Sequence, residues 1–535
     1  MNIQLVQQKF TICILFLITL LWVGMTFSAA AAEQILRKGN GPEPQSLDPH
    51  QSQGVSASNI LRDLYEGLIS EAPNGELIPG VAKRWQIDES GTHYTFYLRE
   101  QAKWSNGDPV TAHDFVYSWR RIVNPQTGSA YAQTLAPILN ANAIIQGEKD
   151  PTTLGVQALD DFTLAVKLQG PTPYFLGLLT HSTTYPLHAV TVKKYGNKFA
   201  RAEHSVSNGA YQLTEWVVQS HIILKRNSRY WGDAKTRIHT VYYYPIEDQS
   251  TELKRYRAGE IDLTYGIPLN QYKWIKKHLA KEFHVAPYLG TYYYGFNLTK
   301  PPFKDNKKLR QALTMAIDRE IIAEKVTGGG EIPAYGWVPP RVLNYQAQTF
   351  AWHKMDKTTR LAEARKLYHQ AGYSKTNPLV VEVRYNTSEN HKKIALAISS
   401  MWKKALGVRV KLLNEEWKVF LANRKQKLTQ AFRSGWIADY NDAFSFAELL
   451  YSQHGINDTG YNNSDYDSLL KQSAIEKDPN KRRQLLEQAE QTMLADYPMM
   501  PVYFYVTKRL IKPYVRGYQG NIMDHHYTKN MHLAK

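Results

Sequence analysis

The chain has 535 residues, and its 65 Lys and Arg outnumber its 48 Asp and Glu to give a formal net charge of +17. Such a length exceeds one ordinary domain, so two or three domains are expected. A basic balance can indicate nucleic-acid binding, but the positive residues are scattered in pairs such as Lys193/Lys194 and Lys403/Lys404, which is typical of solvated helix faces. We therefore expect no nucleic-acid partner.

Residues 1–32 have the pattern of a cleavable secretory signal. Lys9 precedes an apolar run from Phe10 to Val23, and Ala29 to Ala32 provide the small residues of a cleavage site. A membrane anchor is the alternative, but the run is short for a span and lacks strongly basic flanks. The single cysteine, Cys13, lies in this run, so the mature chain has neither a disulfide nor a thiol nucleophile.

The first part of the mature chain alternates strands and helices. A short strand is predicted from Gln34, and apolar spacing predicts a helix from about Ser58 to Leu68. The alternating segment His93–Leu98 predicts a strand. A helix entered at Thr111 follows, with Asp114 placed to complete a capping box.

Two later segments, residues 238–265 and 379–412, predict strand–helix–strand units. In each unit a helix crosses between two strands that are expected to pair in parallel. Two α/β lobes are therefore predicted. The predicted strands are 238–244, 261–265, 379–385 and 408–412, and the predicted helices are 250–257 and about 390–406.

Asp439 is a carboxylate set among apolar and aromatic residues, Trp436 to Ala438 and Tyr440. A buried carboxylate is unfavourable by several kcal/mol, to order of magnitude, unless a cation pairs with it. Arg424 and Arg433 are candidate internal partners, which would make a structural ion pair. The amino group of a ligand is the other candidate, with the aromatic residues as pocket walls. This stretch alone leaves both interpretations open.

The helix predicted near Asn390 carries His391, Lys392 and Lys393 in its first turn. The positive end of the helix dipole disfavours each cation there by about 0.3 to 1 kcal/mol. An anionic group arriving at this helix start would be favoured by the backbone N–H groups and the cationic side chains together. The plainer alternative is that the lysines point outward into solvent.

Five motifs, in their order and spacing, resemble bacterial extracellular solute-binding proteins of family 5, in the branch that binds oligopeptides and murein peptides. The resemblance covers essentially the whole mature chain. The motifs are SLDPH at 46–50, VTAHDFVYSW at 110–119, TYYY at 291–294, YNTSENHKK at 385–393 and GWIADYN at 435–441.

The resemblance implies an α/β, two-lobed periplasmic-binding-protein fold of type II (cluster C), with an extra domain in lobe 1. Two extended aromatic segments, 285–297 and 500–514, would form a two-segment hinge, although ordinary core strands within one lobe are an alternative for them. The implied boundaries are 33–65, 190–290 and 507–535 for the core of lobe 1, 66–189 for its additional domain and 291–506 for lobe 2.

The resemblance also assigns roles to the charged residues. Asp439 matches the aspartate that takes the α-amino group of a peptide. Arg433, Arg424 and His391 match the cationic groups that hold the C-terminal carboxylates of peptides of different length. Tyr131 matches a tyrosine that hydrogen-bonds the peptide near its N-terminus.

Trp417, Trp436 and Tyr265 match aromatic residues that line side-chain pockets, and Gly435 and Ile437 of the GWIADYN motif complete the expected set. Without the resemblance, Tyr265 and Trp417 would be read as ordinary packing residues, as would Tyr131.

Gln53 departs from the pattern, since this branch carries a glutamate there, beside the equivalent of Arg433. Arg433 is then less neutralised, and we expect a preference for ligands with a carboxylate near it, murein tripeptide included.

The implied function is that of a periplasmic receptor of an ABC importer, a monomer that binds short peptides between closing lobes and delivers them to a membrane permease, with no cofactor. A secreted peptide hydrolase is the main rival, but HExxH, GxSxG and GxxxxGK[ST] motifs are absent from the sequence. Gly328–Gly330 is read as the end of a helix, 309–326, and the two histidines of Asp524–His526 as incidental. A receptor for nickel chelate, haem or a sugar oligomer is the second rival, because one fold hosts many ligands.

Overall fold

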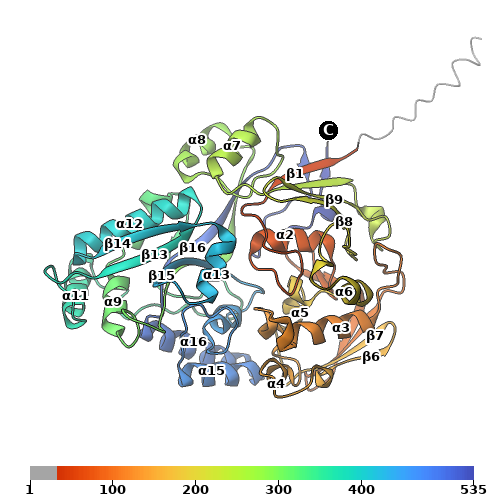
Figure 1. The fold of residues 1–535 in the computed structure, drawn as a ribbon, viewed down its shortest axis with the longest axis horizontal. Helices are drawn as coiled ribbons and strands as arrows, with labels where there is room; N and C mark the ends of the chain where they lie inside the picture. Colours follow the sequence, from red (N-terminus) through yellow and green to blue (C-terminus); the bar gives the residue numbers. More distant parts are fainter. Residues whose placement is uncertain (1–32, 535) are drawn as a thin grey trace, which may run out of the picture. The chain divides into compact units, whose positions relative to one another are not determined.

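Two sheets organise the chain, which is coloured along its sequence in Figure 1. The computed structural model describes residues 33–534, so the predicted signal, residues 1–32, lies outside the described residues. A four-stranded sheet, ordered β1-β10-β9-β8, organises the first lobe, and a six-stranded sheet, ordered β12-β16-β11-β15-β13-β14, organises the second. The two-lobed α/β prediction is confirmed.

In the first sheet, β1 (Ile35–Gly39) pairs in parallel with β10 (Thr240–Tyr244). The antiparallel strands β9 (His221–Arg226) and β8 (Tyr211–Val217) follow. The predicted parallel pairing of 238–244 with 261–265 was wrong. Within the described chain the second segment forms only isolated bridges at Leu263, one of them parallel to β1, because β1 occupies the edge of β10.

In the second sheet, the predicted strand–helix–strand unit is confirmed. The strands β13 (Val380–Asn386) and β14 (Arg409–Glu415) pair in parallel, and α12 (Glu389–Leu406) crosses between them (Figure 1). The helix buries Ile398 and Trp402 on one face and ends at Gly407.

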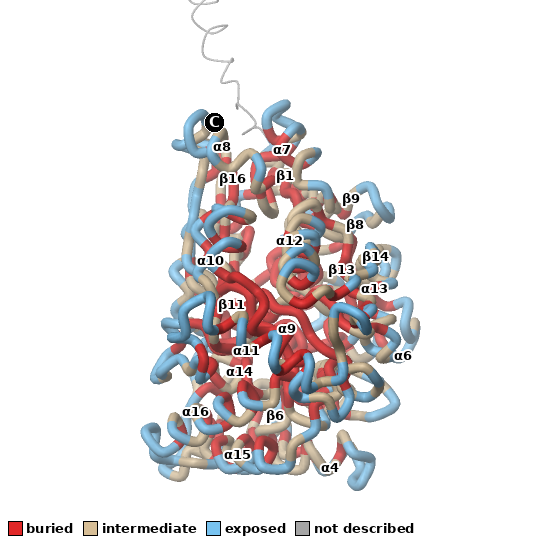
Figure 2. Tube along the Cα trace, turned by 90° about the vertical axis from the view of Figure 1, so that its left-hand side faces the viewer, coloured by how far each residue is buried: buried red, intermediate tan, exposed pale blue. Residues whose placement is uncertain are grey.

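Two long strands, β11 (Phe283–Phe296) and β16 (Met499–Leu510), pair antiparallel along most of their length. At one end Ile511, which follows β16, bridges to Leu263 of the first lobe. At the other end β11 pairs with β15 (Ala431–Ile437) inside the second sheet. Figure 2 shows buried chain at β11, whose residues are all buried from Leu289 onward. The two strands therefore connect the lobes.

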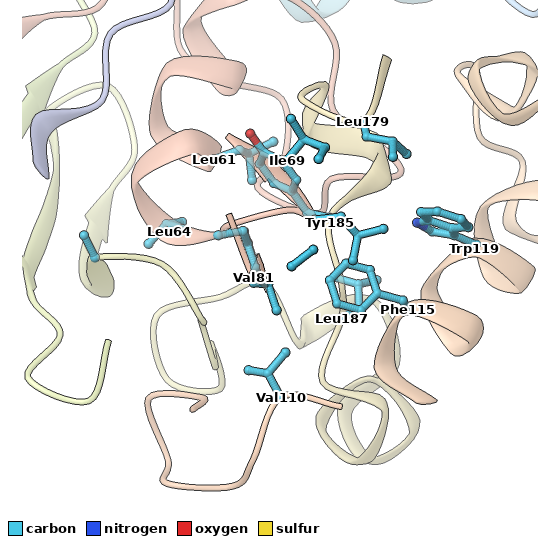
Figure 3. Packing of buried hydrophobic residues seen from close by; sticks show 14 of the residues in the cluster. Leu61, Leu64, Ile69, Val81, Val110, Phe115, Trp119, Leu179, Tyr185 and Leu187 are labelled. Atoms are coloured by element: carbon cyan, nitrogen blue, oxygen red, sulfur yellow. The ribbon is translucent and has the colours of Figure 1, made fainter. Parts of the chain in front are cut away.

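Each lobe has its own hydrophobic core. In the first lobe, α2 (Val55–Leu64) turns Leu61 and Leu64 toward Ile69 and Phe115, as Figure 3 shows. Helix α2 begins three residues before the predicted Ser58 and ends four before Leu68. The second core gathers residues between 289 and 523. The domain boundaries stay a prediction.

The segment between α2 and β8 carries another sheet of the first lobe, which is ordered β4-β5-β7-β6 and is antiparallel throughout. Strand β5 (His93–Leu98) has its predicted bounds. Helix α3 (Ala112–Val123) begins after Thr111, and the Thr111 N–H donates to the Asp114 carboxylate at 2.8 Å, so the predicted capping box is confirmed.

The helix predicted at 309–326 is interrupted. Helix α9 (Lys307–Met315) stops, and Asp318 caps α10 (Arg319–Ile321), which continues as a π-helical turn, Ile322–Thr327. Gly328, at φ 60°, ends that turn, so the glycine run does close a helical segment.

The remaining helices are α4 (Ala141–Ile145), α5 (Phe175–Leu178), α6 (Ala189–Tyr195), α7 (Gln249–Arg257), α8 (Tyr272–His278), α11 (Lys357–Gln370), α13 (Trp417–Lys425), α14 (Phe444–Ala447), α15 (Ser464–Ile475) and α16 (Pro479–Asp496). The remaining strands are β2 (Ile69–Glu71), β3 (Leu77–Pro79), β4 (Ala82–Ile87), β6 (Val156–Asp160), β7 (Thr163–Lys167), β12 (Ile332–Pro333), β17 (Val515–Arg516) and β18 (His532–Leu533).

We expect Gly407→Ala to destabilise the second lobe by about 1 kcal/mol, because Gly407 has φ 79° and an L side chain is strained there. The nearest atom to an added Cβ lies 4.0 Å away, so sterics add little. Urea unfolding followed by tryptophan fluorescence measures the shift. Gly266→Ala is the matched control, since Gly266 is outside the positive-φ set and has nothing within 4 Å. Equal midpoints for both variants would contradict the argument.

Candidate ligand-binding site

A cavity of about 310 Å³ lies between the two lobes and takes its walls from both. The first lobe contributes the start of α2 and the loops at Tyr131 and His181, and the second contributes α12, α13 and β15. The structure brings every site residue predicted from the sequence to this one cavity. They are Gln53, Tyr131, Tyr265, His391, Trp417, Arg424, Arg433, Gly435, Trp436, Ile437 and Asp439.

Asp439 follows β15, where the Ala438 N–H still donates to the Leu289 carbonyl at 2.9 Å. Its own N–H donates to the Ser445 hydroxyl at 2.9 Å, which fixes the backbone. The carboxylate is 12% exposed, and burial raises its pKa to about 7. The His181 ring lies against the carboxylate, with Oδ1 and Nε2 3.3 Å apart.

His181 does not neutralise this carboxylate at pH 7. Burial lowers the pKa of His181 to about 3, with the positive charge of Arg62 as the next cause, so the ring is uncharged. A neutral imidazole can offer Asp439 a hydrogen bond but no positive charge. The acid is therefore held in the cavity without a cation in contact.

The two arginines proposed as internal partners of Asp439 are engaged elsewhere. Arg424 pairs with Asp458, to which its Nε donates at 2.8 Å. Arg433 donates to the Asn386 side chain at 3.1 Å and to the Tyr505 hydroxyl at 3.0 Å. The interpretation of Asp439 as one half of a structural ion pair with an arginine is therefore wrong.

Arg433 is itself a buried charge in the cavity wall. It lies 4.7 Å from the centre of the Tyr292 ring, and its Nε has no hydrogen-bond partner within the described chain. Gly435 makes room for this arrangement, because a Cβ at that position would lie 2.5 Å from the Tyr505 hydroxyl. Since Arg433 contacts no carboxylate among residues 33–534, its guanidinium can pair with a carboxylate of a ligand.

His391 lies in the first turn of α12, with Nδ1 3.4 Å from the Tyr292 hydroxyl. Burial and then the charge of Arg433 hold its pKa well below the usual range. His391 is thus neutral at pH 7, which differs from the cation that the resemblance implied. Lys392 is exposed, as the plainer alternative had it.

The aromatic residues differ in how they meet the cavity. The Tyr131 ring lies 5.1 Å from the His181 ring. The Trp436 indole is held by the Ser445 carbonyl at 2.6 Å and packs in the core of the second lobe. Trp417 packs over Gly54, beside Gln53, and its Nε1 lacks a partner in the described residues.

Two further aromatic or apolar residues complete the set. The Arg509 guanidinium lies over the Tyr265 ring, 5.7 Å from its centre. The backbone N–H of Tyr265 donates to the Glu252 carboxylate at 2.6 Å. Ile437 faces Gly290 across the β11–β15 pair, where a Cβ on Gly290 would meet the Ile437 side chain at 2.4 Å.

Sequence reasoning missed several residues that line this cavity. The most informative are Arg62 and His181, because both act on Asp439. His181 stands in a loop with no periodic pattern, and only the fold brings it to Asp439. Tyr505 and Asn386 were missed too, although both lie in segments that the sequence analysis had marked. Their contact with Arg433 depends on strand register.

The acids at the C-terminal end of the chain are already paired. His525 contacts Glu71 at 2.7 Å, and His526 contacts Asp524, also at 2.7 Å. The two adjacent histidines therefore serve different carboxylates. Among residues 33–534 no group of three or more metal-ligating side chains is arranged to hold an ion. No helix in the same range combines the length and apolar character needed to span a bilayer.

The lobes also meet beside the cavity, where α7 approaches the start of α12. The Gln249 side chain donates to the Ser388 hydroxyl at 3.3 Å, and the Ser250 hydroxyl donates to Glu389 at 2.8 Å. The Asn390 side chain donates to the Ile267 carbonyl at 3.4 Å. These contacts are few and polar.

Comparison with known proteins agrees with this geometry. The family model described as "Bacterial extracellular solute-binding proteins, family 5 Middle" matches residues 76–458. The periplasmic oligopeptide-binding protein OppA of Escherichia coli (strain K12) is 45% identical over 509 residues, which cover 94% of this chain and 93% of the relative.

Two relatives of known structure superimpose closely. The Haemophilus influenzae OppA complex with RPPGFSPFR gives a TM-score of 0.92 at 42% identity, covering 94% of this chain and 99% of the relative. The Escherichia coli murein tripeptide binding protein MppA gives 0.92 at 40%, with the same coverage. The unliganded open form of MppA gives only 0.66, over 94% of this chain and 98% of that one. The lobes here are therefore arranged as in the first two structures and not as in the open form.

The family match spans well over half of the chain, and the relatives share both its length and its fold. The chain belongs to the bacterial extracellular solute-binding proteins of family 5.

Proposed function

We propose that this protein is a periplasmic receptor that binds short peptides between its two lobes and delivers them to the permease of an ABC importer. The observation that carries the proposal is the buried carboxylate of Asp439, which faces the interlobe cavity without a cation in contact within the described chain. An incoming ammonium group supplies that cation. The names of the relatives, which include oligopeptide- and murein-peptide-binding proteins, point to the same ligand class.

Binding starts from the two charged ends of the ligand. The α-ammonium group pairs with Asp439 in a site that excludes water, where an ion pair is stronger than in solution. The carboxylate end pairs with Arg433, whose Nε is unpartnered within residues 33–534. Between these ends the peptide lies extended and is held through its main chain, so its side chains are read loosely.

Closure of the lobes then follows from the ligand. The cavity walls come from both lobes, so a ligand that contacts both favours the closed arrangement over the open one. We propose that the permease recognises this closed form and that the ligand is released chemically unchanged. Incubating the protein with a peptide and recovering it intact by mass spectrometry separates this role from that of a hydrolase with Asp439 as a general acid.

We expect Asp439→Asn to weaken the binding of trialanine about 100-fold in titration calorimetry, because it removes one partner of a desolvated ion pair. N-acetylation of the peptide, which removes the ammonium charge, should weaken binding to the unchanged protein by a similar factor. The variant should no longer distinguish trialanine from its acetylated form.

Glu448→Gln is the matched control for that experiment. Glu448 is a neighbouring carboxyl group that accepts a hydrogen bond from Tyr440 at 2.9 Å, and burial raises its pKa well above the usual range, which favours the uncharged form; it also lies outside the lining of this cavity. Its replacement should leave affinity nearly unchanged. Undiminished binding of trialanine by Asp439→Asn would refute the proposed role.

Affinity should also depend on pH. Burial raises the pKa of Asp439 to about 7 in the ligand-free protein, but the ammonium group needs the ionised carboxylate. Binding therefore expels a proton below pH 7, and affinity should fall there by up to about tenfold per pH unit. Affinity should also fall above about pH 8, where the α-ammonium group of the peptide itself loses its proton. Calorimetry in two buffers of different ionisation enthalpy measures the released proton. A pH-independent affinity between 5.5 and 8 is the outcome that this account does not allow.

Gln53 should tune the preference for acidic ligands. We expect the protein to favour Ala-Ala-Glu over Ala-Ala-Gln several-fold in a competition assay, and Gln53→Glu to reduce that preference, because a carboxylate at position 53 would compete for Arg433. Gln51→Glu is the control, since Gln51 is exposed and lies outside the cavity lining. Equal affinity of the unchanged protein for the two peptides would count against a ligand carboxylate near Arg433.

A further inference from the structure

Helix α2 presents one face to the ligand cavity. Val55, Ser58 and Arg62 all line the cavity, and their spacing of three and four residues places them along one side of the helix. Leu61 and Leu64 of the same helix belong to the core of the first lobe, where Figure 3 labels them. The helix therefore holds the Arg62 side chain against the cavity from a rigid support.

Arg62 is a buried cation that the protein leaves uncompensated. The residue is only 7% exposed, and its side chain makes no hydrogen bond or ion pair with any other residue in the range 33–534. Glu71, whose pKa the charge of Arg62 helps to lower, is committed to His525 at 2.7 Å and to the Tyr527 hydroxyl at 3.0 Å. A buried guanidinium in this state is unfavourable unless an anion joins it.

The charge of Arg62 acts at the Asp439 end of the cavity. After burial, which raises the pKa of Asp439, the charge of Arg62 is the cause that lowers it. Arg62 also lowers the pKa of His181, again after burial. The charge of Arg433 acts on other neighbours, His391 among them. The cavity wall thus holds two guanidinium groups without a carboxylate in contact, and Arg62 is the one whose charge reaches Asp439.

We propose that Arg62 binds the side-chain carboxylate of an acidic first residue of the ligand, in a peptide whose α-ammonium group is held by Asp439. The proposal rests on the proposed function above and names a ligand subclass within it. In aspartate and glutamate the ammonium and the side-chain carboxylate are two or three carbon–carbon bonds apart, so one residue can span a neighbouring acid and guanidinium. The paired charges of the ligand then complement the unpaired charges of the protein.

This arrangement makes the first position selective although the main chain is read loosely. A neutral first side chain leaves the guanidinium desolvated and unpaired, and a lysine there brings a like charge to it. A peptide with an acidic first residue pairs its ammonium group with Asp439 and its side-chain carboxylate with Arg62. Arg62 is thus a specificity-determining residue for the first side chain, whereas Asp439 anchors every peptide with a free amino end.

The test compares Glu-Ala-Ala with Gln-Ala-Ala by titration calorimetry. The unchanged protein should bind the acidic peptide about tenfold more tightly, and Arg62→Gln should abolish the difference. Arg62→Lys should retain part of it, because it keeps the charge but loses the fork of donors. Arg433→Gln, the same substitution in the same cavity, should leave the first-position preference unchanged.

A second pair of peptides checks position. The ratio between Ala-Ala-Glu and Ala-Ala-Gln should survive Arg62→Gln, which separates the effect of this residue from a general loss of positive charge. Circular dichroism and thermal melting report whether the variants fold. We expect Arg62→Gln to be at least as stable as the parent, since it removes an uncompensated buried charge.

Two outcomes overturn the proposal. One is equal affinity of the unchanged protein for Glu-Ala-Ala and Gln-Ala-Ala, which decides the matter even if a variant fails to fold. The other is a preference that persists in Arg62→Gln. In both cases tight binding of trialanine shows that peptide binding itself stands, whereas failure to bind trialanine is a failure of the proposed function.

Discussion

The structure depends on one constraint, which is that a carboxylate is kept out of water without a cation in contact. Asp439 is fixed by backbone and side-chain contacts from both lobes, through Ser445 on one side and His181 on the other. An uncharged imidazole and a hydroxyl orient the acid, but neither satisfies its charge. Because this negative charge has no cation in contact, the cavity between the two lobes favours a ligand that carries a positive charge.

Asp524, another acid of the cavity wall, shows the contrast with Asp439. Asp524, which also lines the cavity, pairs with Arg509 and with His526, and the arginine and histidine hold its pKa below the usual range although burial opposes them. Arg424 is likewise paired, with Asp458. Asp524 and Arg424 are thus neutralised internally, whereas Asp439, Arg62 and Arg433 have no oppositely charged side chain in contact within residues 33–534.

The fold was predictable where local signals were sufficient. The unit built from β13, α12 and β14 follows from apolar periodicity and from Gly407, all within some 35 residues of chain. The first predicted unit was half wrong because the true neighbour of β10 is β1, about 200 residues earlier. No local pattern in 238–265 contains that strand, so its pairing could not be read from the segment itself.

The binding site, too, was predictable from the sequence in some of its residues and not in others. The GWIADYN stretch drew attention because a charge among aromatics breaks a local rule, and the structure places that stretch in the cavity wall. Arg62 breaks no such rule, since an arginine in the last turn of a helix is where the dipole favours one. Its burial and its place in the cavity wall are properties of the fold. The low pKa of His391 could not be predicted from the sequence for the same reason, because its burial and the nearness of Arg433 are properties of the fold.

The few polar contacts between α7 and α12 have a consequence for how the protein is used. Each hydrogen bond of this kind contributes about 1 kcal/mol net. The three side-chain contacts described there therefore stabilise the closed arrangement only weakly. Parting the lobes also separates the stacked rings of Tyr174 and Tyr440, whose centres lie 4.8 Å apart at the edge of the first core, whereas the pairing of the crossing strands β11 and β16 need not change. Such a protein can bind and release ligand many times without refolding. The lifetime of its closed form then depends mainly on the ligand and less on the direct contacts between α7 and α12.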